Sequence, residues 1–163
     1  MNFISKILAP TDCSEASIDA LKYSIKIAKT HRAELIALHV VSRLGNAASH
    51  SHSDKSVSNS KVHFAAKHQL EEFWKSMSEN EIEANLIVEY GDPFDEIIRY
   101  SKSNKNDIIV MGTHGRTGLM HVLMGSVAEK VVRYSAIPVV TVKHENYEFF
   151  PKPGYEYDLN KRY

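Results

Sequence analysis

Short apolar runs rich in β-branched residues alternate along this chain with segments of helical period, and this alternation constrains the fold more than any other feature. The expected strands are 6–10, 33–41, 82–90, 107–112 and 137–143. The expected helices are 14–32, 61–80, 91–104 and 126–135. Strand and helix in strict alternation predict an α/β fold, in which a five-stranded parallel sheet is doubly wound by helices joined through right-handed crossovers.

Two segments fall outside this pattern. Residues 42–60 are rich in Ser, His, Asn and Asp and show no apolar period, so we expect a flexible loop there. Residues 144–163 carry two prolines and four tyrosines without a clear period, which predicts a C-terminal extension. We therefore expect one Rossmann-like domain over 1–143, a size that can bury a hydrophobic core.

Composition excludes several classes of partner. Twenty basic residues balance twenty acidic ones, which gives no overall attraction to nucleic acid or to a membrane surface. Cys13 is the one cysteine, so an internal disulfide is impossible and a reducing compartment is expected. No run approaches the roughly 18 apolar residues of a membrane span, and the first apolar run ends at Pro10, unlike a secretory signal. We expect a cytoplasmic protein.

Four of the seven glycines crowd the stretch VMGTHGRTGLMHVLMGSVAEK, residues 110–130. Gly112 and Gly115 follow an expected strand, and Gly125 and Ser126 begin an expected helix. Ser126 and Glu129 fit a capping box at that start. A helix N-terminus offers unpaired N–H groups and a positive dipole, which suit phosphate oxygens.

Phosphate could approach these N–H groups because glycine has no Cβ, and Gly112 and Gly115 could form an anion-binding nest. Arg116 adds a positive charge with bidentate reach. The alternative is that the glycines only make a tight turn and a close contact between helix and strand. The spacing G-x2-G-x9-G-S matches neither a P-loop nor the G-x-G-x-x-G pattern.

Open parallel sheets bind ligands beyond the carboxyl ends of their strands, at the point where the strand order reverses. Three polar or glycine-containing stretches occupy such positions here: residues 10–14 (PTDCS), 39–41 (HVV) and 111–115 (MGTHG). A ligand pocket is expected where some of these stretches meet.

The chain resembles the universal stress protein family over about residues 1–143. The resemblance rests on KILAPTDCSEAS, ALHVV, GDPFDEI, NDIIVMGTHGRTGL and MGSVAEKVVRYSAIPVVTV, which occur in the family's order. It implies a five-stranded, adenine-nucleotide α-hydrolase-like domain that forms a homodimer. Members that bind ATP carry the glycine spacing present at Gly112, Gly115, Gly125 and Ser126.

The resemblance implies a nucleotide site whose residues lie near the three carboxyl-end stretches. They are Pro10, Thr11, Asp12, Val40, Met111, Gly112, His114, Gly115, Arg116, Gly125, Ser126 and Val127. Asp12 would hold the ribose or the adenine edge, although it could instead cap a helix in competition with Ser14. Val40 and Met111 would pack on adenine, or serve only as core. His114 and Arg116 would contact phosphates, and the helix start would donate N–H groups.

These features favour an ATP-binding regulatory protein, with slow hydrolysis or none, because no motif places a base to activate water. The cofactor would be ATP, or ADP or AMP, with Mg²⁺ or Mn²⁺ bridging the phosphates. One alternative is an enzyme of the α-hydrolase or nucleotidyl-transferase kind, but S-G-G-x-D-S and H-I-G-H signatures are missing. The other is a nucleotide-free dimeric scaffold that acts through protein partners.

Nine histidines are many for this length. His50, His52 and Asp54 lie close in sequence, with His63 and His68 further on, but their spacing fits no standard zinc site. We expect no metal there, and a structural role for His39. The last strand, 137–143, would expose its edge, and pairing with the same strand of a second copy would cover it.

Overall fold

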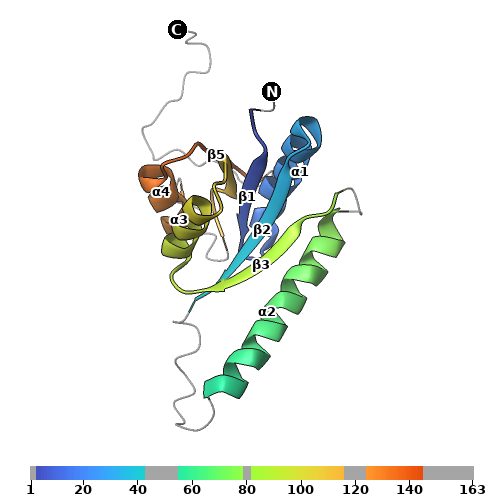
Figure 1. The fold of residues 1–163 in the computed structure, drawn as a ribbon, viewed down its shortest axis with the longest axis vertical. Helices are drawn as coiled ribbons and strands as arrows, with labels where there is room; N and C mark the ends of the chain where they lie inside the picture. The colour runs from blue at the N-terminus through green and yellow to red at the C-terminus, as the bar shows by residue number, and fades with distance from the viewer. Residues whose placement is uncertain (1–2, 43–54, 79–81, 116–123, 145–163) are drawn as a thin grey trace, which may run out of the picture.

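The computed structural model describes residues 3–42, 55–78, 82–115 and 124–144. Within these ranges, five parallel strands form one sheet in the order β3-β2-β1-β4-β5 (Figure 1). The strands are β1 (Lys6–Thr11), β2 (Glu34–Val41), β3 (Asn85–Tyr90), β4 (Ile108–Gly112) and β5 (Val139–Val142). The α/β class and the doubly wound parallel sheet predicted from the sequence are confirmed.

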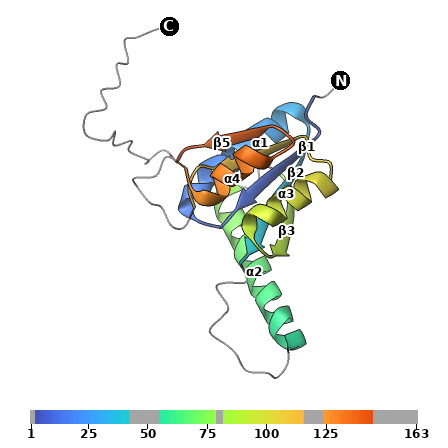
Figure 2. The same cartoon turned by 90° about the vertical axis from the view of Figure 1, so that its left-hand side faces the viewer.

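Helices cover both faces of the sheet (Figures 1 and 2). They are α1 (Ile18–His31), α2 (Lys55–Ser78), α3 (Pro93–Ser103) and α4 (Ser126–Tyr134), and a short 3-10 turn, η1 (Glu15–Ser17), precedes α1. Helices α1 and α2 pack on one face, and α3 and α4 pack on the other. None of these helices, in the part of the chain that the structure describes, is long and apolar enough to cross a bilayer.

The sheet separates two hydrophobic cores because successive side chains of a strand point to opposite faces. Leu21 of α1 and Trp74 of α2 pack with Leu35 in the first core. In the second core, Ile97 of α3 and Val131 of α4 pack with their own set of strand residues. A fully buried aliphatic side chain of this kind contributes about 1.5–3 kcal/mol, so these two clusters hold the helices to the sheet.

Helix α3 begins as its sequence predicts. Asp92 is the N-cap, and its carboxylate accepts hydrogen bonds from the N–H groups of Phe94, at 2.9 Å, and Asp95, at 3.2 Å. Pro93 occupies the first turn, where its missing N–H costs nothing. Arg32 is the C-cap of helix α1 and has a left-handed backbone (φ 53°). Its N–H donates to the carbonyls of Ala28 and Lys29.

Several predicted boundaries are wrong. Helix α2 begins at Lys55, so the predicted loop 42–60 is partly helical. Its first turns, KSVSNS, are rich in Ser and Asn, whose helix propensity is modest, and they show no apolar stripe. Strand β3 starts three residues later than predicted, at Asn85. Residues 43–54 and 145–163 lie outside the described residues, as do His50, His52 and Asp54.

The strand order places the reversal of the sheet at its centre. The chain runs outward from β1 through β2 to β3, then crosses back to add β4 and β5 on the other side of β1. The switch point is therefore the gap between the carboxyl ends of β1 and β4, where ligands of open α/β sheets bind.

Candidate functional site

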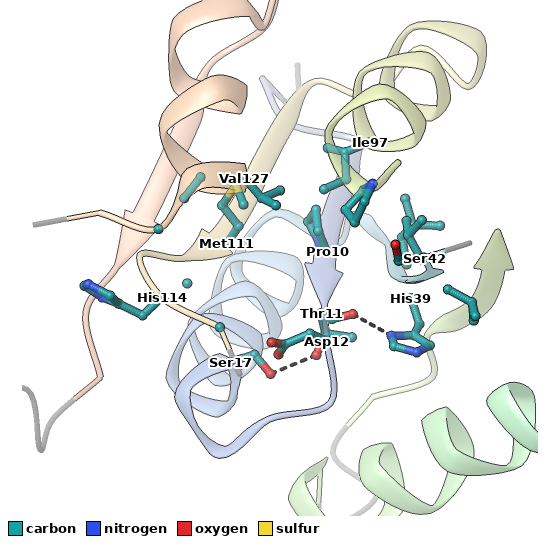
Figure 3. Close-up of a pocket in the computed structure, with 18 of the residues that line it drawn as sticks. Pro10, Thr11, Asp12, Ser17, His39, Ser42, Ile97, Met111, His114 and Val127 are labelled. Carbon is teal, nitrogen blue, oxygen red and sulfur yellow. Dashed lines mark hydrogen bonds between the residues drawn. The ribbon is translucent and has the colours of Figure 1, made fainter. Parts of the chain in front are cut away.

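A cavity of about 720 Å³ opens at this switch point (Figure 3). Its walls come from the carboxyl ends of β1, β2 and β4, the starts of α3 and α4, and one side of α2. The lining residues are Pro10, Thr11, Asp12, Ser17, Leu38, His39, Val40, Val41, Ser42, Val62, Ala65, Ala66, Gln69, Pro93, Ile97, Met111, Gly112, Thr113, His114, Gly115, Gly125, Ser126, Val127 and Ala128.

The sequence-predicted site residues are brought together by this arrangement. Eleven of the twelve line the cavity, and the twelfth, Arg116, lies outside the described residues. Shared position does not by itself assign each residue a ligand role. Sequence reasoning missed the contributions of α2 and α3, such as Ala66 and Ile97, because no motif indicates which side of a distant helix reaches a pocket.

The cavity wall is apolar on the side of α3 and α4. Leu38, Val40 and Met111 of the strands meet Ile97 of α3 and Val127 of α4 there. Such a wall suits a flat apolar group, since binding of that group removes apolar surface of both the wall and the group from water.

The loop after β1 is ordered by a chain of hydrogen bonds. The N–H of Cys13 donates to Thr11 Oγ1 at 3.0 Å, and Thr11 Oγ1 lies 2.8 Å from Ser17 Oγ. Ser17 in turn donates to the carbonyl of Ser14 at 2.7 Å. Because Ser17 uses its proton there, Thr11 donates to Ser17. Cys13 has φ 58°, a left-handed conformation that is uncommon for residues other than glycine.

Asp12 points between the two loops of the site. Its Oδ1 accepts from Ser14, from the N–H at 3.1 Å and from the hydroxyl at 2.6 Å. Asp12 therefore makes a local turn rather than capping α1, and Ser14 is the N-cap of η1 without a side-chain hydrogen bond to it. A Cβ added to Gly115 would lie 2.5 Å from Asp12 Oδ2, so the loop after β4 packs directly against this carboxylate.

The glycines of the site serve close packing. A Cβ on Gly112 would lie 3.2 Å from the carbonyl oxygen of Ala16, and one on Gly125 would lie 3.3 Å from that of Thr113. The close contact between helix and strand, which the sequence left as an alternative, is present at Gly112, the last residue of β4, which packs against η1. Glycine lets the two loops and the start of α4 approach one another closely enough to form one wall.

The start of α4 differs from its predicted form in two ways. Gly125 is the N-cap and Ser126 the first helical residue, so no capping box forms, and Glu129 pairs with Arg133 at 2.9 Å instead. The N–H of Gly125, predicted to be among the donors at the helix start, donates to Thr113 O at 2.7 Å in this structure.

Three main-chain donors at the start of α4 belong to residues that line the cavity. The first bond of the helix runs from Glu129 N–H to Gly125 O, so the N–H groups of Ser126, Val127 and Ala128 have no partner within the helix. None of the three donates to another residue of the described part of the chain, and all three residues line the cavity. A helix start with unpaired N–H groups is an arrangement that suits an anion, because the helix dipole also favours negative charge there.

The described lining has little side-chain charge. Asp12 is its one carboxylate, no lysine or arginine belongs to it, and His39 and His114 supply its imidazoles. His114 Nδ1 lies 2.9 Å from Thr113 Oγ1. Among the described residues, no cluster of His, Cys, Asp and Glu could hold a metal ion.

Residues 4–143 match the sequence profile of the universal stress protein family. The chain belongs to this family. Universal stress protein MJ0577 of Methanocaldococcus jannaschii is 36% identical over 86% of this chain and 96% of its own length. Universal stress protein YxiE of Bacillus subtilis is 31% identical over 85% of this chain and 99% of its own.

Solved structures of universal stress proteins share the fold. UspA from Lactobacillus plantarum superimposes with a TM-score of 0.70 at 26% identity, covering 86% of this chain and 98% of its own. The resemblance read from the sequence motifs is thereby confirmed at the level of family and fold.

Proposed function

We propose that this universal stress protein binds an adenine nucleotide, ATP or else ADP or AMP, in the cavity at the switch point. It would act as a nucleotide-dependent regulatory protein in the cytoplasm, with slow hydrolysis or none. One observation carries the proposal: three N–H groups at the start of α4, without partners among the described residues, belong to residues that line a cavity with an apolar wall.

The parts of a nucleotide match the parts of the cavity. Adenine would pack between Pro10, Val40 and Met111, where burial of both ring faces is favourable. Ribose hydroxyls would donate to Asp12, the one carboxylate of the described lining. The phosphates would reach the start of α4 at Ser126 and Val127.

Phosphate charge would be balanced mainly by main-chain dipoles. His114 borders the phosphate side of the lining, and we propose that Arg116 supplies a positive charge there. Mg²⁺ or Mn²⁺ would bridge phosphate oxygens and be held by the nucleotide, because the described lining offers few protein oxygens of the kind these ions prefer.

Two proteins of the same fold support the class of ligand. One universal stress protein was solved in complex with cAMP (TM-score 0.60, 21% identity), and one from Archaeoglobus fulgidus in complex with dAMP (TM-score 0.55, 20% identity). At such identities the likeness extends to the fold, and the choice of nucleotide by this chain remains our proposal.

The hydrogen bonds of the two side chains that could act as a base support slow hydrolysis or none. Asp12 Oδ1 already accepts two hydrogen bonds from Ser14. His114 Nδ1 is engaged with the hydroxyl of Thr113. General-base catalysis needs a group that can reach the attacking water's proton, and both side chains already make hydrogen bonds within the protein.

The sharpest test removes one amide donor without disturbing the helix. Ser126 is the first residue of α4, a position that accepts proline, and Gly125 before it has the extended backbone (φ −66°, ψ 153°) that proline requires. Ser126→Pro deletes one N–H group, whereas the control Ser126→Ala deletes only the hydroxyl. We expect Ser126→Pro to weaken ATP about tenfold, the size of one hydrogen bond to a charged group, and to leave adenosine affinity unchanged.

Isothermal titration calorimetry of both variants with ATP and adenosine measures these differences. Equal loss of adenosine and ATP affinity would place the helix start away from the phosphates. Absence of any adenine nucleotide binding by the wild-type protein, in titration and in mass spectrometry of small molecules released on denaturation, would overturn the proposal and favour a nucleotide-free scaffold.

We also propose that the protein forms a homodimer through its last strand, predicted over 137–143. Strand β5 is at the end of the strand order, and its residues are only half-buried within one chain.

A further inference from the structure

His39 is a polar side chain buried beside the ribose end of the cavity. It is 5% exposed and belongs to the lining. Its Nδ1 lies 2.9 Å from the carbonyl oxygen of Thr11, its partner in the register of β1 and β2 (Figure 3). Because a carbonyl oxygen can only accept, Nδ1 carries the proton and donates it.

This bond acts at the place where β1 becomes the loop. Thr11 is the last residue of β1, and the carbonyl of Thr11 shares a rigid peptide plane with the N–H of Asp12. Fixing that carbonyl therefore fixes the direction in which Asp12 leaves the strand. The next residue, Cys13, has a left-handed backbone and turns the chain away from the strand.

Two sets of contacts therefore hold Asp12. After Asp12, the carboxylate is fixed by the N–H and hydroxyl of Ser14. Before Asp12, the anchor comes from the neighbouring strand β2 through the imidazole of His39. An apolar residue could fill the same buried space, but it would leave the carbonyl of Thr11 without this donor.

We infer that His39 is a positioning residue, which orients the Thr11 peptide so that the carboxylate of Asp12 faces the ribose. The inference rests on the proposed function, in which Asp12 accepts hydrogen bonds from the ribose hydroxyls. The orientation of the loop itself does not depend on a ligand, so it can be measured in the protein without nucleotide.

Matched variants separate the donor from the space that the ring fills. His39→Asn keeps an N–H donor close to the place of Nδ1, whereas His39→Gln moves the same amide one methylene further out. His39→Leu keeps apolar volume and has no donor. Ser24→Ala is the control for a generic loss, because Ser24 is also fully buried and donates to a main-chain carbonyl, that of Leu21, within α1.

The first measurement is the rate at which a thiol reagent labels Cys13 in the protein without nucleotide. Cys13 is the one cysteine of the chain and lies next to Asp12, so labelling reports on this loop alone. We expect His39→Leu and His39→Gln to label about five to ten times faster than wild type. His39→Asn and Ser24→Ala should stay within about twofold of it.

The second measurement is binding of adenosine and ATP by titration. His39→Leu should weaken both by the same factor, about fivefold to tenfold, since both ligands carry the ribose. In an Asp12→Ala background the same substitution should cost no further affinity. His39→Asn should restore most of the wild-type affinity.

The outcomes are distinct. Wild-type labelling rates in both His39→Leu and His39→Gln would overturn the inference, as would an equal loss of affinity with and without Asp12. If His39→Leu does not fold, as judged by circular dichroism, the pair His39→Asn and His39→Gln decides the question. If the wild-type protein binds no nucleotide, the proposed function fails while the labelling rates still test the anchor.

Discussion

Gly115, in the loop after β4, packs against the carboxylate of Asp12, in the loop after β1. A methyl group on Gly115 would lie 2.5 Å from Asp12 Oδ2, which is far below van der Waals contact. Gly115→Ala must therefore rotate the carboxylate away from Ser14 or push the loop outward. We expect it to lower the free energy of unfolding by about 1–2 kcal/mol, as overpacking does, and to weaken nucleotides.

A double-variant cycle checks the cause. In an Asp12→Ala background the methyl group has space, so Gly115→Ala should cost little stability there. Chemical denaturation of the four proteins gives the coupling free energy. Equal costs in both backgrounds would show that strain elsewhere in the loop, and not the carboxylate, makes the glycine necessary.

The residues of the site could be predicted from sequence more completely than their individual roles. Motif spacing identified Gly112, Gly115 and Gly125, but it could not tell a glycine that admits a phosphate from one that admits another loop. The difference lies in where the missing Cβ points, which is a property of the folded backbone. The same limit explains the capping box: Ser126 and Glu129 fit the pattern, yet the helix begins one residue earlier than that pattern requires.

Strand β5 leaves one row of main-chain groups without a partner in the sheet. Ile109 N–H donates to Pro138 O and Thr113 N–H donates to Val142 O. Because this ladder alternates, the main-chain groups of Val139 and Thr141 point away from β4. They are the groups that a second copy of β5 would pair with.

Thr141→Pro tests this pairing with one lost donor. Proline removes the outward N–H of Thr141, and edge strands tolerate it because the bonds to β4 come from other residues. We expect the dimer to dissociate at least tenfold more readily, the effect of about 1.4 kcal/mol, in light-scattering measurements over a dilution series. A wild-type dissociation constant would exclude this edge as the interface.

Helices and strands with a strong hydrophobic period or a clear capping signal could be predicted from the sequence. Boundaries that depend on other contacts could not. Asp92 and Pro93 predict the start of α3, because an N-cap and a first-turn proline stabilise a helix start through residues only a few positions away. The first turns of α2 carry no such signal. Helix α1 loses its expected first turn to η1, because Ser14 and Ser17 are engaged in the loop network.

Asp107 ties the amino end of the sheet together across about a hundred residues of sequence. Its Oδ2 accepts from the N–H and hydroxyl of Ser5 and from the N–H of Lys6, each at 2.8 Å. These hydrogen bonds, first of all the one from the Ser5 N–H, lower the pKa of the Asp107 carboxyl. The carboxylate joins the start of β1 to the start of β4 at the end of the sheet opposite the cavity.

Because the pKa of Asp107 is lowered in the folded protein, the free energy of unfolding depends on pH in the acid range. The folded protein binds the Asp107 proton less readily than the unfolded chain, so the contribution is complete above the ordinary carboxyl pKa near 4 and falls away as the pH drops below it. Asp107→Asn should lower the free energy of unfolding by about 1 kcal/mol at pH 7 and flatten the loss of stability between about pH 5 and 3. Urea denaturation across that range measures both, and parallel wild-type and variant curves would contradict the assignment.

The position of the site was predictable from topology because carboxyl ends of parallel strands converge wherever the chain reverses. The predicted stretches 10–14, 39–41 and 111–115 all reach the cavity. Its full outline was not predictable, since the walls from α2 and α3 depend on how far each helix lies over the sheet edge.

Thr113 makes main-chain hydrogen bonds to two different elements. Its N–H holds the last residue of β5, and its carbonyl holds the first turn of α4 through Gly125. A shift of Thr113 would therefore be transmitted both to the end of β5 and to the start of α4. One residue thus links the cavity side formed by α4 to the edge strand of the sheet.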